Sequence, residues 1–180
     1  MPVVEPAYAL LGVAAEHGLR QTVVALDGAL QSGIIDGERI NEVVAECGGW
    51  PGRTMLQRAM NVADPRCESP GETLTRLLLR SLGIPARSQV TITASGPSFT
   101  ARVDFLLEAY PVVIEFDGMM KYGSADQGAN RRALVAEKQR EDRLRSLGYE
   151  VVRLVWADLK NPDVVRRRIE AACRRSSKVA

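Results

Sequence analysis

The sequence predicts a mixed α/β domain that follows a helical N-terminal segment, and three observations support this reading. Residues 1–68 show the three-to-four-residue spacing of amphipathic helices throughout. Residues 69–180 alternate between helical spacing and the two-residue alternation of half-buried strands. Between these regions, two prolines and small polar residues interrupt the periodicity at 64–70. We therefore expect two domains, 1–68 and 69–180.

The N-terminal segment predicts four helices. They are expected near residues 7–15, 23–30, 36–47 and 52–63, and glycines follow each of the first three. The segment carries five arginines and nine acidic residues, which gives it a net charge of −4. Its acidic helical surface holds no cluster of candidate catalytic residues, so it indicates packing or contact with a protein partner rather than chemistry.

The second half predicts six core elements in a definite order. A helix begins with Ser69-Pro70-Gly71-Glu72, and a strand follows near 89–93. Two alternating strands near 99–107 and 112–117 are close enough along the chain to form a hairpin. A charged helix near 130–147 and a strand near 149–156 come next. The order is α-β-β-β-α-β, followed by a last helix, which predicts an α/β sheet flanked by helices.

Three carboxylates mark the predicted hairpin. Pairing Phe105 with Ile114 keeps apolar side chains opposite one another and sets Asp104 opposite Glu115. Asp117 follows two residues later on the same face. Like charges directly opposite each other on neighbouring strands are destabilising, so we expect something to compensate them.

A divalent cation would provide this compensation. Mg²⁺, or Mn²⁺ in its place, binds one or two carboxylates together with waters and substrate phosphate oxygens, which is the chemistry of phosphodiester cleavage. We expect Asp104 and Glu115 to bind the metal and Asp117 to complete the acidic shell. The alternative is that the three acids only solvate the outer face of an edge hairpin, as alternating polar residues usually do.

Composition excludes several other classes of protein. No apolar run approaches the roughly 18 residues of a membrane span, and the N-terminus has no pattern of a signal peptide. Cys47, Cys67 and Cys173 form no CxxC pair. The single histidine, His17, argues against a histidine-based nuclease. We expect a cytoplasmic protein with no membrane association and no structural zinc.

The second half is the basic half of the chain. Residues 69–180 carry a net charge of +6, which suits a nucleic-acid partner but is also ordinary for a solvated surface. Candidate phosphate contacts are Arg140, Arg166, Arg167 and Arg168. Arg140 shares a helical stripe with Glu137, and the acids of the hairpin could supply a partner for it. The alternative, an ion pair between Glu137 and Arg140, is favoured over a catalytic role.

Residues 69 to about 169 resemble the DUF559 family, relatives of the very-short-patch-repair endonuclease within the PD-(D/E)XK nuclease superfamily. The matching pieces are Ser-Pro-Gly-Glu72, Ala-Arg-Val-Asp104, Val-Ile-Glu115-Phe-Asp117-Gly118, the helix 137–145, and Gly148-Tyr-Glu-Val-Val-Arg-Leu154. The resemblance implies a restriction-endonuclease-like mixed sheet, a Mg²⁺ site at the hairpin and nucleic-acid phosphodiesters as substrates. Residues 1–68 are similar to the helical linker of AbiEi-type antitoxin proteins.

The sequence departs from the superfamily pattern at one position. The pattern has Glu-x-Lys on the second hairpin strand, and here Asp117 stands where that lysine would be. Lys121 either reaches back to supply the cation or is a solvated turn residue. The family also places Glu72 beside the metal, although Ser69-x-x-Glu72 with Pro70 between them equally forms a capping box at a helix start.

These observations predict a metal-dependent, endonuclease-like phosphodiester hydrolase that acts on nucleic acid. Asp104, Glu115, Asp117, Glu72 and Lys121 are the expected site residues. The alternative is a catalytically inactive, nuclease-fold regulator or antitoxin-like protein that binds nucleic acid or a protein partner.

Overall fold

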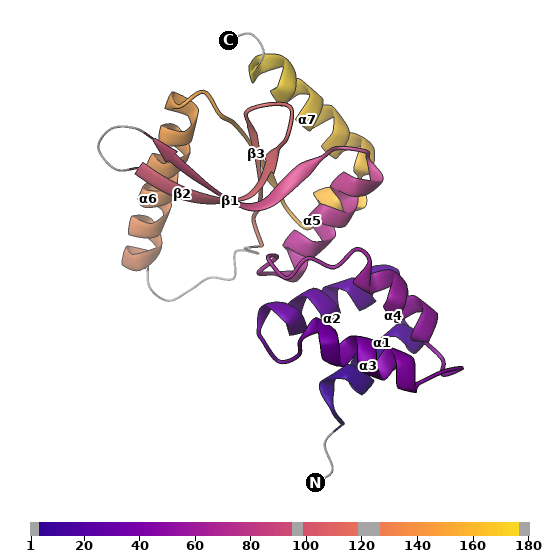
Figure 1. Ribbon diagram of the computed structural model, residues 1–180. Helices are drawn as coiled ribbons and strands as arrows, with labels where there is room; N and C mark the ends of the chain where they lie inside the picture. Colours follow the sequence, from indigo (N-terminus) through magenta and orange to yellow (C-terminus); the bar gives the residue numbers. More distant parts are fainter. Residues whose placement is uncertain (1–3, 95–98, 119–126, 177–180) are drawn as a thin grey trace. The chain divides into compact units, whose positions relative to one another are not determined.

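The computed structural model describes residues 4–94, 99–118 and 127–176, with the backbone alone for 127–134. The chain divides into two compact units, Met1–Leu77 and Leu78–Ala180. The first unit is helical and the second carries the sheet (Figure 1). In the described part of the chain, no helix combines the length and the apolar character that a membrane span requires.

The first unit is built from four helices and the start of a fifth. They are α1 (Pro6–Glu16), α2 (Leu19–Gln31), α3 (Gly37–Glu46), α4 (Arg53–Met60) and α5 (Pro70–Ser81). The apolar faces of α1 to α4 meet in one core, in which Leu11, Leu26, Ile40 and Leu56 are at most 2% exposed. The four expected helices are confirmed, although α2 begins at Leu19 rather than near residue 23.

A buried carboxylate ties α5 to this helical core. Asp27 on α2 is 1% exposed and accepts hydrogen bonds from the backbone N–H of Asp64 at 2.8 Å and the hydroxyl of Thr73 at 2.9 Å. Arg76 adds an ion pair at 2.7 Å. A charge buried this deeply requires such partners, so residues 64–76 fold with the first unit. The structure therefore divides the chain between Leu77 and Leu78, later than the expected boundary after residue 68.

The second unit contains a four-stranded mixed sheet in the order β1-β2-β3-β4. The strands are β1 (Ala86–Ala94), β2 (Phe99–Leu107), β3 (Val112–Phe116) and β4 (Glu150–Leu154). The first three pair antiparallel, and β4 pairs parallel to β3. Phe105 lies opposite Ile114, which confirms the expected hairpin register. The expected order of the six core elements is confirmed, with the first strand starting at Ala86 rather than near residue 89.

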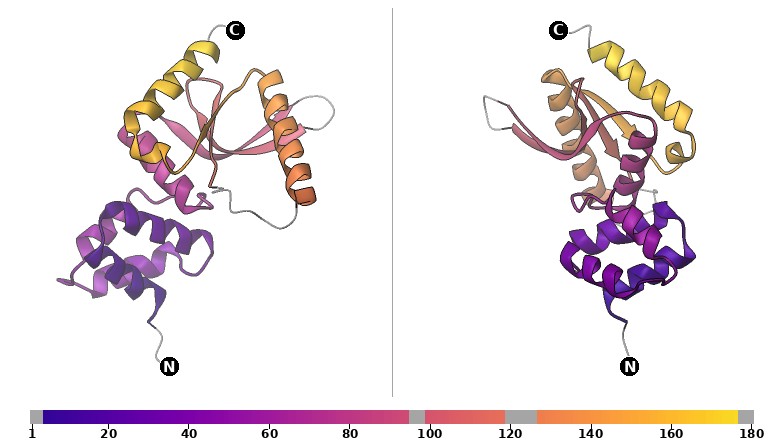
Figure 2. Two further views of the ribbon diagram at one scale, coloured as in Figure 1. Left: turned by 180° about the vertical axis from the view of Figure 1, so that it is seen from behind. Right: turned by 45° about the vertical axis from the view of Figure 1, so that its right-hand side comes forward.

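Helices lie on both sides of this sheet. α6 (Gln127–Ser146) connects β3 to β4, and α7 (Pro162–Ser176) follows a short 3₁₀ turn, Asp158–Lys160. Leu144 of α6 packs with Val103, Val113 and Val151. On α7, Val165 is fully buried. Figures 1 and 2 show α6 and α7 on opposite sides of the strands, so the sheet is covered on both faces.

Gly52 provides a test of the packing in the first unit. It has a φ of 85°, and an added Cβ would meet the backbone of Leu11 and lie 2.6 Å from the nitrogen of Ala15. Gly52→Ala should lower the free energy of unfolding by about 2 kcal/mol or more, because both the backbone conformation and the space favour glycine. The measurement is urea unfolding of the full chain.

Gly28 is the matched control for this substitution. It lies inside α2, and an added Cβ would meet nothing within 4 Å. Gly28→Ala should raise the free energy of unfolding by about 0.5–1 kcal/mol, because alanine restricts the unfolded chain and favours the helix. Equal effects of the two substitutions would contradict the described packing.

Candidate functional site

Asp104 joins the two strands of the hairpin through its side chain. One carboxylate oxygen of this half-buried residue, Oδ2, accepts a hydrogen bond from the backbone N–H of Phe116 at 2.8 Å. The ladder between β2 and β3 pairs Phe105 with Ile114 and Leu106 with Val113, immediately beside this contact. Asp104 therefore holds the end of β3, where Asp117 follows.

Glu115 is buried, with 7% of its surface exposed, and its charge is compensated by arginines. Its Oε1 lies 2.6 Å from a guanidinium nitrogen of Arg140 on α6. Its Oε2 lies 3.5 Å from Arg153, the residue paired with it in register on β4. The compensation that the sequence led us to expect from a metal thus comes, at Glu115, from two side chains of the protein.

These residues belong to a larger ionic cluster, which comprises Glu115, Glu137, Arg140, Glu141 and Arg153. Glu137 binds Arg140 at 2.9 Å and Arg153 at 2.7 Å, and Glu141 binds Arg153 at 3.1 Å. The hydrogen bond from Arg140 holds the pKa of Glu137 below its usual value, and the same bond, together with Glu115, raises the pKa of Arg140. Both shifts favour the charged forms of Glu137 and Arg140. The expected Glu137–Arg140 ion pair is confirmed.

Asp117 lies where β3 ends beside β4. Its backbone N–H donates to the carbonyl of Leu154 at 2.8 Å, and its side chain is half-buried. Next to it in sequence, the ring of Phe116 packs edge to face with Trp156, with ring centroids 4.9 Å apart and an interplanar angle of 81°. Trp156 is 40% exposed. The end of the central strands thus presents an acidic residue next to a partly exposed aromatic pair.

Gln89 on β1 is a neighbour of Asp104 across the sheet. It lies between the pairs Ser88–Phe105 and Val90–Val103, which places it across from Asp104. Its φ of 52° is in the left-handed region. For a residue other than glycine this costs on the order of 1–3 kcal/mol, and such residues cluster at functional sites.

The other expected site residues have different surroundings. Glu72 forms the capping box at the start of α5: it accepts from the hydroxyl of Ser69 at 2.8 Å and from the backbone N–H of Glu68 at 3.0 Å. Lys121 lies outside the described residues. The described contacts therefore support the capping role of Glu72, which is one of the two roles that the sequence left open.

The expected phosphate-binding arginines also differ from one another. Arg140 is engaged in the ionic cluster, Arg166 donates to the carbonyl of Leu82 at 3.1 Å, and Arg168 pairs with Asp158 at 2.8 Å. Arg167 is exposed on α7. Of the four, Arg167 is the best placed to meet a phosphate without giving up a described contact.

The donor chemistry of the hairpin acids suits Mg²⁺, which needs only one or two carboxylates when waters and phosphate oxygens complete its shell. Asp104 and Asp117 supply such oxygens at one end of β3. Glu115 does not fit as a direct ligand in this arrangement, because both of its oxygens face arginines. Within the described ranges, no group of three or more histidine, cysteine or acidic side chains is placed to hold a metal ion.

Sequence reasoning missed Arg153 and Glu141. Arg153 interrupts an otherwise apolar run from Val151 to Val155, and a half-buried charge in such a run requires a partner. The sequence therefore contained a signal that Arg153 has a charged partner. Recognising Glu115 as the partner also required the parallel register between β3 and β4, which the sequence pattern alone does not give.

Comparison with known proteins identifies relatives but no function. No protein-family model and no solved structure matches the chain. The chain is 29% identical over 156 residues to an uncharacterized protein of Mycobacterium tuberculosis, named Rv2248 in strain H37Rv and MT2308 in strain CDC 1551. The match covers 86% of this chain and 55% of the relative, so the chain spans about half the length of the proteins it matches.

Arg140 can be tested against Arg145, a neighbour on the same helix. Arg140→Met should lower the free energy of unfolding by about 3 kcal/mol, because it leaves the buried carboxylate of Glu115 with a single distant cation. Arg145 makes an exposed ion pair with Glu141, so Arg145→Met should cost less than about 0.5 kcal/mol. Denaturant unfolding of both variants measures the difference.

The ionic cluster also predicts a pH dependence. The folded-state pKa of Glu137 is lower than its ordinary value of 4.5, so the stability that this carboxylate contributes is complete above pH 4.5. It is lost as the pH falls further, through the folded-state pKa. The difference in Tm between the wild type and Glu137→Gln should therefore be largest at neutral pH and shrink below pH 4.5. A difference that stays constant down to pH 3 would exclude this contribution.

Proposed function

We propose that the second unit is a metal-dependent phosphodiester hydrolase that acts on nucleic acid. The observation that supports this most directly is the contact of the Asp104 carboxylate with the backbone of Phe116, because it brings Asp104 to the residue that precedes Asp117. Two carboxylates, one within β2 and one directly after β3, are sufficient protein ligands for Mg²⁺. The α-β-β-β-α-β order and the left-handed Gln89 across from Asp104 add to this support.

In this proposal Asp104 and Asp117 hold the metal, and Glu115 positions the strand that carries Asp117. The bound ion would polarise the phosphate and lower the pKa of a water molecule. The hydrogen bond from Phe116 orients the carboxylate of Asp104 at the end of β3. The two arginines hold the Glu115 side chain in place within the sheet.

The surroundings of these acids favour nucleic acid as the substrate. The half of the chain that carries the sheet has a net charge of +6, which attracts a polyanion. The partly exposed Trp156 next to the acids offers a ring face to an unpaired base, and such stacking is worth about 1–3 kcal/mol per base.

A second function is supported by a different observation. Glu115 is neutralised by Arg140 and Arg153 without any metal, and Asp117 replaces the superfamily lysine. Both features suit a nuclease-fold regulator that binds nucleic acid, or a protein partner through its acidic helical unit, without cleaving a substrate. In such a protein Asp104 serves only to join β2 to β3.

Asp104→Asn separates these two functions. Asparagine retains an oxygen that accepts from Phe116, so the folded structure is kept while the negative charge is removed. If the protein is a hydrolase, wild-type protein with Mg²⁺ or Mn²⁺ should cleave a mixed set of single- and double-stranded DNA and RNA, and the variant should fall to the level of an EDTA control. Asp142→Asn, an exposed position on α6, is the matched control and should retain full activity.

Metal response provides the second measurement. A hydrolase should show a higher Tm with Mg²⁺ than with EDTA, and this shift should disappear in Asp104→Asn. Wild-type protein that neither cleaves nucleic acid nor responds to either metal, but binds nucleic acid in EDTA, would replace the hydrolase proposal with the regulator.

A further inference from the structure

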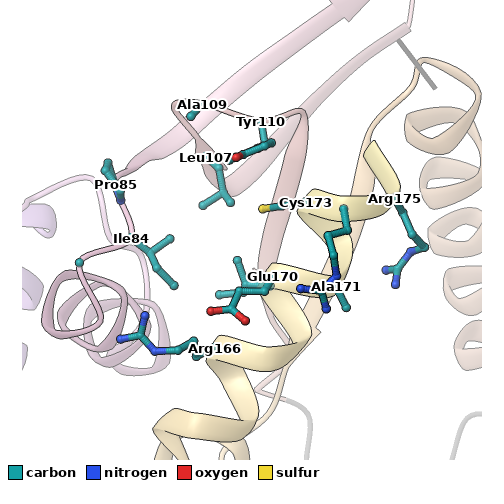
Figure 3. Close-up of a pocket in the computed structure, with 13 residues that line it drawn as sticks. Ile84, Pro85, Leu107, Ala109, Tyr110, Arg166, Glu170, Ala171, Cys173 and Arg175 are labelled. Atoms are coloured by element: carbon teal, nitrogen blue, oxygen red, sulfur yellow. The ribbon is translucent and has the colours of Figure 1, made fainter. Parts of the chain in front are cut away.

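A pocket lies within the second unit, against α7. Its volume is about 720 Å³, inside the range of about 300–1,000 Å³ that is usual for small-molecule sites. Residues of α7 form one wall, the segment from Gly83 to Pro85 forms another, and Leu107 with the hairpin residues Ala109 and Tyr110 closes the third (Figure 3).

One stripe of α7 faces the pocket. Its residues recur at helical spacing, namely Arg166, Ile169, Glu170, Cys173 and Arg174. A separate stripe of the same helix is fully buried in the protein, at Val165 and Ala172. Because α7 already buries one side in the core, the exposed residues of the pocket stripe, Arg166, Glu170 and Arg174, are not the surface that holds the helix in place.

The interior of the pocket is apolar and well defined. Ile84, Leu107 and Ile169 supply aliphatic surface, and Tyr110, which is 43% exposed, supplies an aromatic ring. The backbone N–H of Ile84 donates to the carbonyl of Leu79 at 3.0 Å, which closes the end of α5 and fixes this wall. An apolar ligand body would therefore enter a site that is already formed.

Charge at the edge of the pocket favours an anion. Three of the lining residues are arginines and one, Glu170, is acidic. Two of the arginines are engaged: Arg166 with the carbonyl of Leu82 at 3.1 Å, and Arg175 with Glu150 at 2.8 Å. Arg174 is exposed and has no ion pair with any residue that the structure describes. It is the cation that an incoming anion could pair with at no cost to an existing contact.

We propose that this pocket binds an amphipathic organic anion, with its apolar body against Ile84, Leu107 and Ile169 and its acidic head group at Arg174. Arg166 and Arg174 are eight residues apart, or about 12 Å along the helix. Because Arg166 and Arg175 are engaged elsewhere, the pocket suits a fused aromatic or medium-chain body with one terminal acid. This site is separate from the residues of the proposed hydrolase and does not rest on that proposal.

A pair of matched probes tests the class of ligand. The first is 8-anilinonaphthalene-1-sulfonate, which has an aromatic body and an acidic head, and the second is N-phenyl-1-naphthylamine, which lacks the acid. Arg174→Gln should weaken binding of the sulfonate about tenfold, the usual order for loss of one charged hydrogen bond, and leave the neutral probe unchanged. Arg167→Gln, on α7 but outside the pocket, should change neither. Fluorescence titration of the folded full-length protein gives the dissociation constants.

A second pair of variants tests the location. Ala171→Trp fills the pocket and should abolish binding of both probes, whereas Val164→Trp, at an exposed position of α7 outside the pocket, should not. Thermal melts of both variants establish that they are folded.

Cys173 offers a readout that needs no substitution. Its sulfur lies on the pocket wall (Figure 3), whereas Cys47 and Cys67 are at most 3% exposed. Saturating sulfonate probe should slow alkylation of Cys173 by iodoacetamide. If the folded wild type binds neither probe, if Arg174→Gln weakens both probes equally, or if bound probe leaves the alkylation rate unchanged, the proposal is wrong.

Discussion

The second unit depends on the ion pair between Glu115 and Arg140. It is formed between the central strand β3 and the helix α6, which also meet in apolar packing around Leu144. Apolar packing is not directional and permits a helix to slide or rotate, whereas a buried carboxylate accepts only a narrow range of guanidinium positions. Arg153 extends the same constraint to β4 through the paired position in the ladder. The strand that carries the candidate site is thus fixed by charge as well as by burial.

This arrangement separates the acids of the hairpin by role. Glu115 is neutralised by arginines, Asp104 of β2 accepts from the last residue of β3, and Asp117 directly follows β3. A carboxylate that is neutralised by arginines does not need a metal to be stable in the folded state, and so the fold exists before any ion binds. The candidate site therefore does not need metal to assemble, in contrast to small zinc domains whose folding depends on the ion.

Most of the fold could be predicted from the sequence because its signals are local. Alternation placed β2 and β3, helical spacing placed α1 to α7, and matching apolar residues across the hairpin gave the pairing of Phe105 with Ile114. The site was only partly predictable. The acids were identified, but the partners of Glu115 come from α6 and β4, and a parallel register has no turn that fixes it from nearby sequence. The expected border after residue 68 differs from the border in the structure for a related reason. Prolines at 65 and 70 suggested an open linker, whereas Asp27, far away in sequence, holds that segment in the helical core.

The contact between Asp27 and Arg76 also bears on how such a protein can be assembled from parts during evolution. A sheet unit that began at residue 69 would carry away the cation and leave Asp27 buried without it, and the donor fragment would lose stability. Recombination that exchanges the two units is therefore favoured only at joints after Arg76, inside the continuous helix α5. The modular border of this protein lies within a helix and not in the proline-containing loop that precedes it.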